Sequence, residues 1–245
     1  KKLIYFIDDL NLPYIETYGT QNSIALITQL MQHGTIFDRA DLGFRKEIVD
    51  TQYMTAMNPT AGSFEVCERC QRHFCTFSAS MPGTEDLKLI YGQIFAGHLL
   101  GWPAALVETG EKIVDAAISL CQAVGARFLP SAVKFTYNWN MRELTNIFQG
   151  MTLSSQNDYT NPLLLLRLFV HEACRVIQDR MISEQEMADF ETMLCDATKK
   201  VGLKETPEQL LAMPNCHTAF HEGTTYKPIP DMPKLNKVLE LKLME

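Results

Sequence analysis

The sequence predicts an α/β fold in which part of a parallel sheet is followed by an all-helical subdomain. Two short, continuous apolar runs, at residues 3–7 and 51–57, have the length and composition of buried parallel strands. A helix-length amphipathic segment lies between them. Beyond Gly83 the apolar residues recur at helical spacing only. These observations divide the chain into an α/β part and a helical part.

The composition argues against nucleic acid and membranes as partners. The 245 residues carry a net charge of −7 and no basic run, whereas nucleic acids and anionic membrane surfaces attract basic patches. No stretch approaches the ~20 apolar residues that cross a bilayer. With 46% hydrophobic residues, the chain can build the core of one or two domains. The 7 cysteines form no framework, which indicates reduced thiols in an intracellular protein.

The first part of the chain alternates strands and helices. Residues 21–33 predict a helix, because apolar side chains share one face and Gly34 follows as a stop. Residues 35–46 hold short β-prone pieces, which indicate a hairpin inserted before the strand at 51–57. The further expected elements are a loop around Pro59, Gly62 and Ser63, a short helix at 66–73 and a strand at 74–79.

The second part predicts helices and a proline-rich tail. Thr84 is expected to be the N-cap of the first helix. Further helical patterns cover residues 106–124, 140–153, 162–180 and 184–201, and residues 235–245 resemble the start of another helix. The expected boundaries are residues 1–83 for the α/β part, 84–213 for the helical part and 214–245 for a linker.

Two carboxylates follow the first strand directly. The carboxyl ends of strands in open α/β sheets are the places where ligands bind. Asp8 could hold Mg²⁺ through water, since this ion prefers a few hard oxygen ligands and keeps its waters. Asp9 could orient or activate an attacking water. The alternative is that the two acids only end the strand and cap the next loop.

The second strand ends in Asn58 and Pro59. An amide can donate and accept hydrogen bonds without adding charge, so Asn58 could sense a γ-phosphate or the attacking water. Its alternative role is that of a turn former before proline. In ATPases of the AAA+ kind, two such strand ends lie side by side under the γ-phosphate. Asp9 is one methylene shorter than the Glu of vigorous AAA+ hydrolases, so we expect slow hydrolysis.

Arg69 and Arg72 precede the expected strand at 74–79. This is where AAA+ modules carry the arginine that reaches a neighbouring module's nucleotide, because a guanidinium brings fixed donors and a permanent positive charge. Arg72 is the first choice, since it lies nearer the strand. Either arginine could instead be solvated or paired in a salt bridge.

Arg142 opens the helix expected at 140–153. That helix should bury a stripe of Leu144, Ile147, Phe148 and Met151. Arg142 then lies on another face, where it could bridge the helical subdomain to the phosphates of a nucleotide. The alternative is a surface arginine paired with Glu143 or another nearby acid, which contributes little to stability.

A group of cysteines and a histidine suggests zinc as a further reading. Cys67, Cys70, His73 and Cys75 have spacings that could ligate the ion. Against this, Cys75 falls inside an expected strand, and four ligands so close in sequence are hard to close into a tetrahedron. We therefore favour nucleotide over zinc.

Five motifs occur together in this chain. They are FIDDLNLP at 6–13, YGTQ at 18–21, AMNPTAGSF at 56–64, QRHF at 71–74 and WNMRELTNIFQG at 139–150. As a set they resemble dynein heavy chains, most closely the third AAA+ module of axonemal, outer-arm dyneins. The resemblance covers nearly the whole chain. It implies the C-terminal part of an AAA+ parallel-sheet large subdomain, beginning at Walker B, followed by the all-helical small subdomain.

The resemblance also implies roles for particular residues. Family members tend to have Asn-Pro before the position of Arg69, where this chain has Cys67 and Glu68. The phosphate-binding lysine and threonine would lie upstream of Lys1. The positions match Walker B at Asp8 and Asp9, the first sensor at Asn58, the arginine finger at Arg72 with an adjacent arginine at Arg69, and the second sensor at Arg142.

The resemblance implies cofactors, partners and a location as well. The cofactors are ATP or ADP with Mg²⁺, and in the family the third module regulates the main hydrolytic site of the first. Expected partners are the neighbouring AAA+ modules of the same heavy chain, other dynein chains, and microtubules through other parts of the motor. The location is the cytoplasm and cytoskeleton, in the axoneme of a cilium or flagellum. The alternatives are a structural ring segment with static or no nucleotide, and a MoxR-like AAA+ remodelling ATPase.

Overall fold

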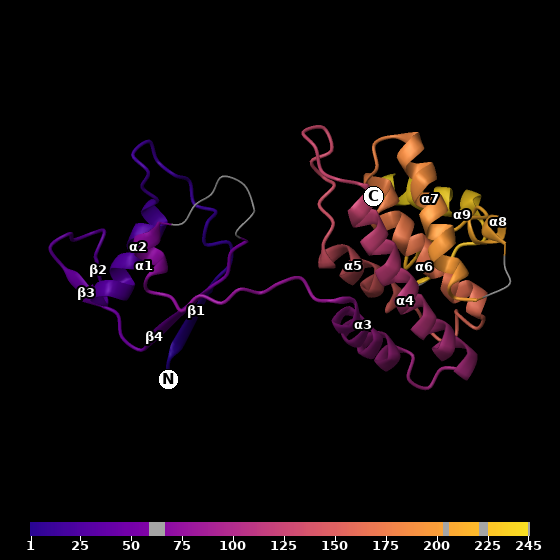
Figure 1. Cartoon of the computed structure of the whole chain (residues 1–245), viewed down its shortest axis with the longest axis horizontal. Helices are drawn as coiled ribbons and strands as arrows, with labels where there is room; N and C mark the ends of the chain where they lie inside the picture. Colours follow the sequence, from indigo (N-terminus) through magenta and orange to yellow (C-terminus); the bar gives the residue numbers. More distant parts are fainter. Residues whose placement is uncertain (59–66, 203–205, 221–224, 245) are drawn as a thin grey trace. The chain divides into compact units, whose positions relative to one another are not determined.

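The computed structural model describes residues 1–58, 67–202, 206–220 and 225–244. The chain divides into two compact units, residues 1–80 and residues 81–245 (Figure 1). We call them the first unit and the second unit, and each is described by itself. In the described part of the chain, no helix is both long and apolar enough to cross a bilayer.

The first unit is built on two parallel strands. β1 (Leu3–Ile7) pairs with β4 (Thr51–Thr55), with Leu3 opposite Thr51 and Ile7 opposite Thr55. Between them, α1 (Asn22–His33) ends at Gly34, whose φ of 64° is the left-handed conformation that glycine adopts readily. β2 (Thr35–Phe37) and β3 (Arg45–Glu47) then form an antiparallel hairpin. The predicted strands, helix and hairpin are confirmed.

The core of the first unit is small. Among the residues described there, Leu10, Ile24 and Cys70 are buried and apolar, and α2 (Glu68–Gln71) brings Cys70 against α1. Most of β1 is uncovered: the Ile4 side chain is 55% exposed and that of Phe6 is 64% exposed. The strand therefore offers an apolar surface and an open edge.

The strand predicted at residues 74–79 is wrong. Phe74 packs against the small core, and the residues that follow are extended and exposed, with Phe77 at 86%. A β-prone run becomes a strand only where it pairs with a neighbouring strand, and residues 74–79 pair with none of the strands described in the first unit. The predicted helix at 66–73 is shorter, and the predicted loop around Pro59, Gly62 and Ser63 lies outside the described residues.

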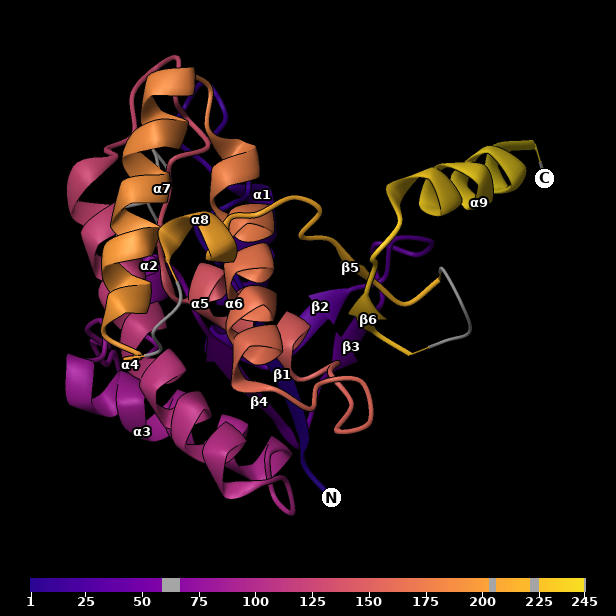
Figure 2. The same cartoon turned by 90° about the vertical axis from the view of Figure 1, so that its right-hand side faces the viewer.

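The second unit is a helical bundle with a continuous apolar core. Its long helix α4 (Ala104–Arg127) contacts the four other main helices, and Figures 1 and 2 show it running beside α6 and α7. Those four are α3 (Thr84–His98), α5 (Met141–Met151), α6 (Pro162–Val176) and α7 (Glu184–Lys199), with the short 3-10 helix η1 (Gln178–Arg180) after α6. The five predicted helical segments are thus confirmed with small shifts of their ends.

The start of α3 differs from the prediction by one residue. Gly83, not Thr84, is the N-cap, and its backbone N–H donates to the Asp86 carboxylate at 3.1 Å. Thr84 lies inside the helix, where its hydroxyl accepts a hydrogen bond from Gln122 at 2.9 Å. The Thr84 side chain thus links α3 to α4 instead of capping α3.

A strap and a last helix follow the bundle. We call residues 211–220 and 225–231 the strap, which leads from α8 (Pro207–Leu210) to α9 (Met232–Met244) (Figure 2). Within it, β5 (His217–Thr218) and β6 (Lys227–Pro228) form a short antiparallel hairpin that was not predicted. Tyr226 also pairs with Ser154, just beyond α5. The helix predicted from residue 235 begins three residues earlier.

Candidate functional site

The ends of β1 and β4 lie side by side, as predicted. The pairing continues past the strands, because the Ala56 N–H donates to Ile7 O at 2.9 Å and the Leu10 N–H donates to Ala56 O at 3.1 Å. Beyond this point, the Asn11 amide donates to the Asn58 carbonyl at 3.2 Å. Asp8 and Asp9 therefore share one edge of the sheet with Asn58.

Asp8 and Asp9 form an exposed turn at this edge. The Asp9 N–H donates to the Asp8 carboxylate at 3.0 Å, and Asp9 has a φ of +50°. A non-glycine residue seldom adopts this left-handed conformation, and the strain costs on the order of 1–3 kcal/mol. Strain of this kind concentrates at ligand and catalytic sites.

The carboxylates at this edge fit a water-mediated Mg²⁺ ion. Both are exposed, and among the described residues no Lys, Arg or His lies within 4.0 Å of either of them. Hard, negatively charged oxygens without a protein counter-ion are the donors that Mg²⁺ prefers. Asp8 is the residue that could hold it, with Asp9 beside it at the same edge.

Asn11 is a structural residue of the site that the sequence analysis missed. It is 6% exposed, and its amide ties the loop after β1 to the end of β4. The sequence signal that could have identified Asn11 is its position three residues after Asp8, in the same motif. Gln21, also buried, fixes the other end of that loop by donating to Pro13 O at 3.0 Å.

Arg69 and Arg72 are both exposed on α2 and its C-cap. The Arg72 Nε donates to the His73 ring at 3.4 Å. Neither guanidinium has an acidic partner within ion-pair distance among the described residues. Cys70 between them is fully buried in the small core, which sets the face that α2 presents.

The cysteines near α2 do not converge on one point. Cys70 is buried, whereas Cys67 and Cys75 are exposed. In the part of the chain that the structure describes, no three His, Cys, Asp or Glu side chains are arranged to hold a metal ion.

Arg142 lies in the first turn of α5, in the second unit. The predicted buried stripe is confirmed, and Arg142 is exposed on another face. The alternative, a pairing with Glu143, is contradicted: the Glu143 carboxylate accepts from the Arg180 guanidinium and from the Asn140 N–H, each at 2.7 Å. Asn140 caps the helix by accepting from the Arg142 N–H at 2.7 Å. No acid pairs with Arg142 in the described residues.

Comparison with known proteins identifies the family. Residues 1–82 match the family model of the P-loop containing dynein motor region, and residues 113–210 match that of the AAA+ lid domain. The chain is 43% identical over 245 residues to dynein axonemal heavy chain 17 of Mus musculus, and 41% identical over 244 residues to the ciliary dynein beta chain of Tripneustes gratilla. Each alignment covers 98% of this chain.

The chain belongs to the axonemal dynein heavy-chain family. It also matches the dynein beta chain of the flagellar outer arm of Chlamydomonas reinhardtii, with 39% identity over 259 residues, 100% of this chain and 6% of the relative. The chain spans 5% of the length of the mouse and sea urchin relatives. Asp8, Asp9 and Asn58 lie in the matched motor region, and Arg142 lies in the matched lid domain.

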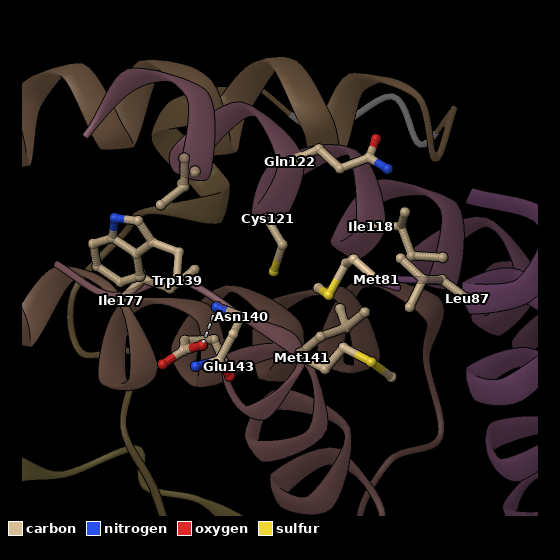
Figure 3. Close-up of a pocket in the computed structure, with 13 residues that line it drawn as sticks. Met81, Leu87, Ile118, Cys121, Gln122, Trp139, Asn140, Met141, Glu143 and Ile177 are labelled. Atoms are coloured by element: carbon tan, nitrogen blue, oxygen red, sulfur yellow. Dashed lines mark hydrogen bonds between the residues drawn. The ribbon is translucent and has the colours of Figure 1, made fainter. Parts of the chain in front are cut away.

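This dynein-family chain also contains an apolar pocket beside the start of α5. Its volume is about 190 Å³, and it is lined by side chains of α3, α4 and α5 (Figure 3). Figure 3 shows the sulfur atoms of Cys121 and Met81 among the side chains that line it, together with the hydrogen bond between Asn140 and Glu143. Burial, with the nearby Glu143 charge, raises the pKa of the Cys121 thiol to about 12, so the thiol stays protonated.

Proposed function

We propose that this chain is a regulatory AAA+ module of a dynein microtubule motor, the third module of the ring, with a nucleotide site shared between modules. The observation that carries the proposal is the parallel pairing of β1 with β4, which brings Asp8 and Asp9 to the same edge as Asn58. Residues 1–83 would be the end of its large subdomain, 84–213 its small subdomain, and 214–245 the linker toward the next module.

The roles follow from the chemistry of each side chain. Asp8 holds Mg²⁺ through water, and the ion offsets phosphate charge when it is bound. Asp9 orients the attacking water, and Asn58 hydrogen-bonds the γ-phosphate or that water. Hydrolysis is slow, since Asp9 has a short side chain on a left-handed backbone. ATP or ADP is thus the ligand whose state the module reports.

The arginines connect this nucleotide state to other parts of the motor. Arg142 contacts the phosphates from the helical subdomain, whereas Arg72, with Arg69 beside it, reaches the nucleotide of the preceding module. The exposure of these guanidiniums, without acidic partners in the described residues, supports both roles. Since the relatives are named as ciliary and flagellar axonemal dyneins, we place the chain in an axoneme, with other dynein chains and, through other parts of the motor, microtubules as partners.

The test compares two aspartates in the intact heavy chain. Asp9→Asn should slow microtubule gliding at least about fivefold, within the usual range of allosteric coupling. Asp50→Asn is the matched control, because Asp50 is also exposed and left-handed, with a φ of 58°, but lies at the opposite end of the sheet. Unchanged gliding velocity with Asp9→Asn would reject the regulatory role and favour a structural ring segment with a static nucleotide.

A second variant tests the arginine finger. Arg72→Ala should slow or uncouple the motor while the affinity of this module for ADP stays the same. The control is Arg39→Ala, which removes another exposed arginine of the first unit. Equal gliding velocities for the two variants would remove Arg72 from the mechanism.

A further inference from the structure

A fully buried carboxylate lies where α5, α6 and the strap meet. Glu172 of α6 has an exposed fraction of 0%. The Arg175 guanidinium donates to it twice, at 2.7 and 3.0 Å, and the Tyr226 hydroxyl of the strap donates to its other oxygen. A carboxylate is seldom buried this fully unless such partners compensate for its lost hydration.

A glycine of α5 makes room for this carboxylate. A Cβ added to Gly150 would overlap the Glu172 carboxylate, so a larger residue at this position would force the carboxylate to move. Glycine is otherwise a poor residue inside a helix. We call Gly150, Glu172, Arg175 and Tyr226 the clasp.

Tyr226 joins the end of α5 from a second side. It forms a β-bridge with Ser154, which lies three residues beyond the helix. The Ser154 hydroxyl donates to Met151 O at 2.7 Å and contacts the His98 ring at 3.1 Å. The strap is therefore attached by its backbone to the residues just beyond α5, and by its tyrosine side chain to Glu172 of α6, whose carboxylate lies against Gly150 of α5.

The other half of the strap is attached to α6. Asn215 donates to Arg167 O at 3.1 Å, and the Arg167 guanidinium donates to Ala212 O at 2.7 Å. The His217 ring contacts the Tyr159 hydroxyl at 2.8 Å. In the described part of the strap, these contacts therefore join the residues around Asn215 to α6, whereas those around Tyr226 also reach α5, through Ser154 and through the Glu172 carboxylate beside Gly150.

We propose that Glu172 is a positioning residue, whose clasp makes α5 and the strap move as one body. Arg142 lies at the N-terminal end of α5 and the clasp at its C-terminal end, so a displacement of the helix would be passed to the strap and onward to α9. This output route deepens the proposed function, and its nucleotide-dependent part rests on that function.

The first test is hydrogen exchange of the 245-residue chain with two glycine variants. Gly150→Ala should speed exchange about tenfold or more, both in residues 148–154 and in residues 225–231, because a hydrogen bond to a buried charge is lost. If the clasp did not exist, Gly150→Ala would leave hydrogen exchange in α5 unchanged or make it slower, because alanine is a better helix former than glycine. Gly125→Ala is the matched control: it also lies near the end of a helix, and its added Cβ meets only Trp139 at 3.9 Å.

A tyrosine pair repeats the test without a steric clash. Tyr226→Phe removes only the hydroxyl that Glu172 accepts, and it should loosen the same two segments. Tyr137→Phe removes a comparable hydroxyl, which donates to Glu186 at 2.7 Å, and should loosen only the contact with the start of α7. Faster exchange in the strap alone, or the same pattern for both tyrosines, would overturn the clasp.

The second test adds nucleotide to the intact heavy chain. Mg·ADP and a slowly hydrolysed Mg·ATP analogue should change strap exchange in the wild type and in Tyr137→Phe, but not in Tyr226→Phe, while exchange around Arg142 responds in all three. A strap response that survives in Tyr226→Phe would overturn the output route. If nucleotide changed exchange around Arg142 in none of the variants, the proposed function would be rejected instead. The clasp would then be judged by the first test alone.

Discussion

The two units of the chain differ in how completely they bury their apolar residues. In the second unit, Phe169 and Phe190 are 0% exposed within a core shared by all the main helices. In the described residues of the first unit the parallel sheet has two strands, and the Phe6 side chain is 64% exposed. A two-stranded sheet is rarely stable by itself, whereas the helices of a bundle bury a core between one another. Arg142 therefore lies on a self-supporting frame, and Asp8 on one that further contacts would stabilise.

The largest effect on stability is expected in the core of the second unit. Phe169→Ala should lower the free energy of unfolding of this unit by about 3–5 kcal/mol, because it leaves a cavity among fully buried neighbours. The control is Phe135→Ala, since Phe135 is 77% exposed. Urea denaturation followed by helical circular dichroism measures both, and equal losses would show that the unit is not packed as described.

Acid should weaken the second unit through its buried histidine. Burial, with the nearby His171 and Arg167, lowers the pKa of His217 from 6.5 to about 3. The unfolded chain therefore binds the proton more readily, and stability falls as the pH drops below 6.5. Between pH 6.5 and pH 5 the free energy of unfolding should fall by up to about 2 kcal/mol.

Urea titrations at several pH values measure this loss. His217→Gln should flatten the dependence, whereas His33→Gln, at an exposed position of the first unit, should leave it unchanged. A pH slope that is the same in both variants would assign the proton uptake to other groups, such as His98 and His171, whose pKa values burial also lowers.

A smaller effect is expected at the N-cap of α5. Asn140→Ala removes the acceptor of the Arg142 N–H and should cost about 1 kcal/mol. Asn146→Ala is the matched control, since Asn146 is exposed within the same helix, where alanine is the better helix former. Thermal melting of both variants checks the difference, and an Asn140→Ala chain as stable as Asn146→Ala would argue against the cap.

The smallest change in stability, with a clear effect in solution, is expected on β1. Phe6→Lys should change the unfolding free energy by less than about 0.5 kcal/mol, because the side chain is already exposed. It should nevertheless reduce self-association, since a charge on an open strand opposes edge-to-edge pairing. Light scattering measures self-association in this variant and in Phe77→Lys, which replaces an exposed phenylalanine outside a strand. A larger reduction with Phe6→Lys would assign the effect to the strand edge and not to exposed hydrophobicity in general.

Local signals in the sequence predicted much of the fold. The buried stripe of α5 and the alignment of Asp8 with Asn58 follow from the periodicity of one helix and from the common direction of parallel strands. The strand expected at 74–79 failed because strand formation depends on a partner edge. The Glu172 clasp was not foreseen, since it joins residues from α5, α6 and the strap, which are far apart in sequence.

A structure of the intact ring with Mg²⁺ and nucleotide tests the proposed site at once. We predict nucleotide and Mg²⁺ beside Asp8, Asn58 and Arg142, with Arg72 reaching the pocket of the preceding module. A pocket without nucleotide, in which Asp8 and Arg142 pair with protein groups, would contradict the gating role and leave a structural ring segment.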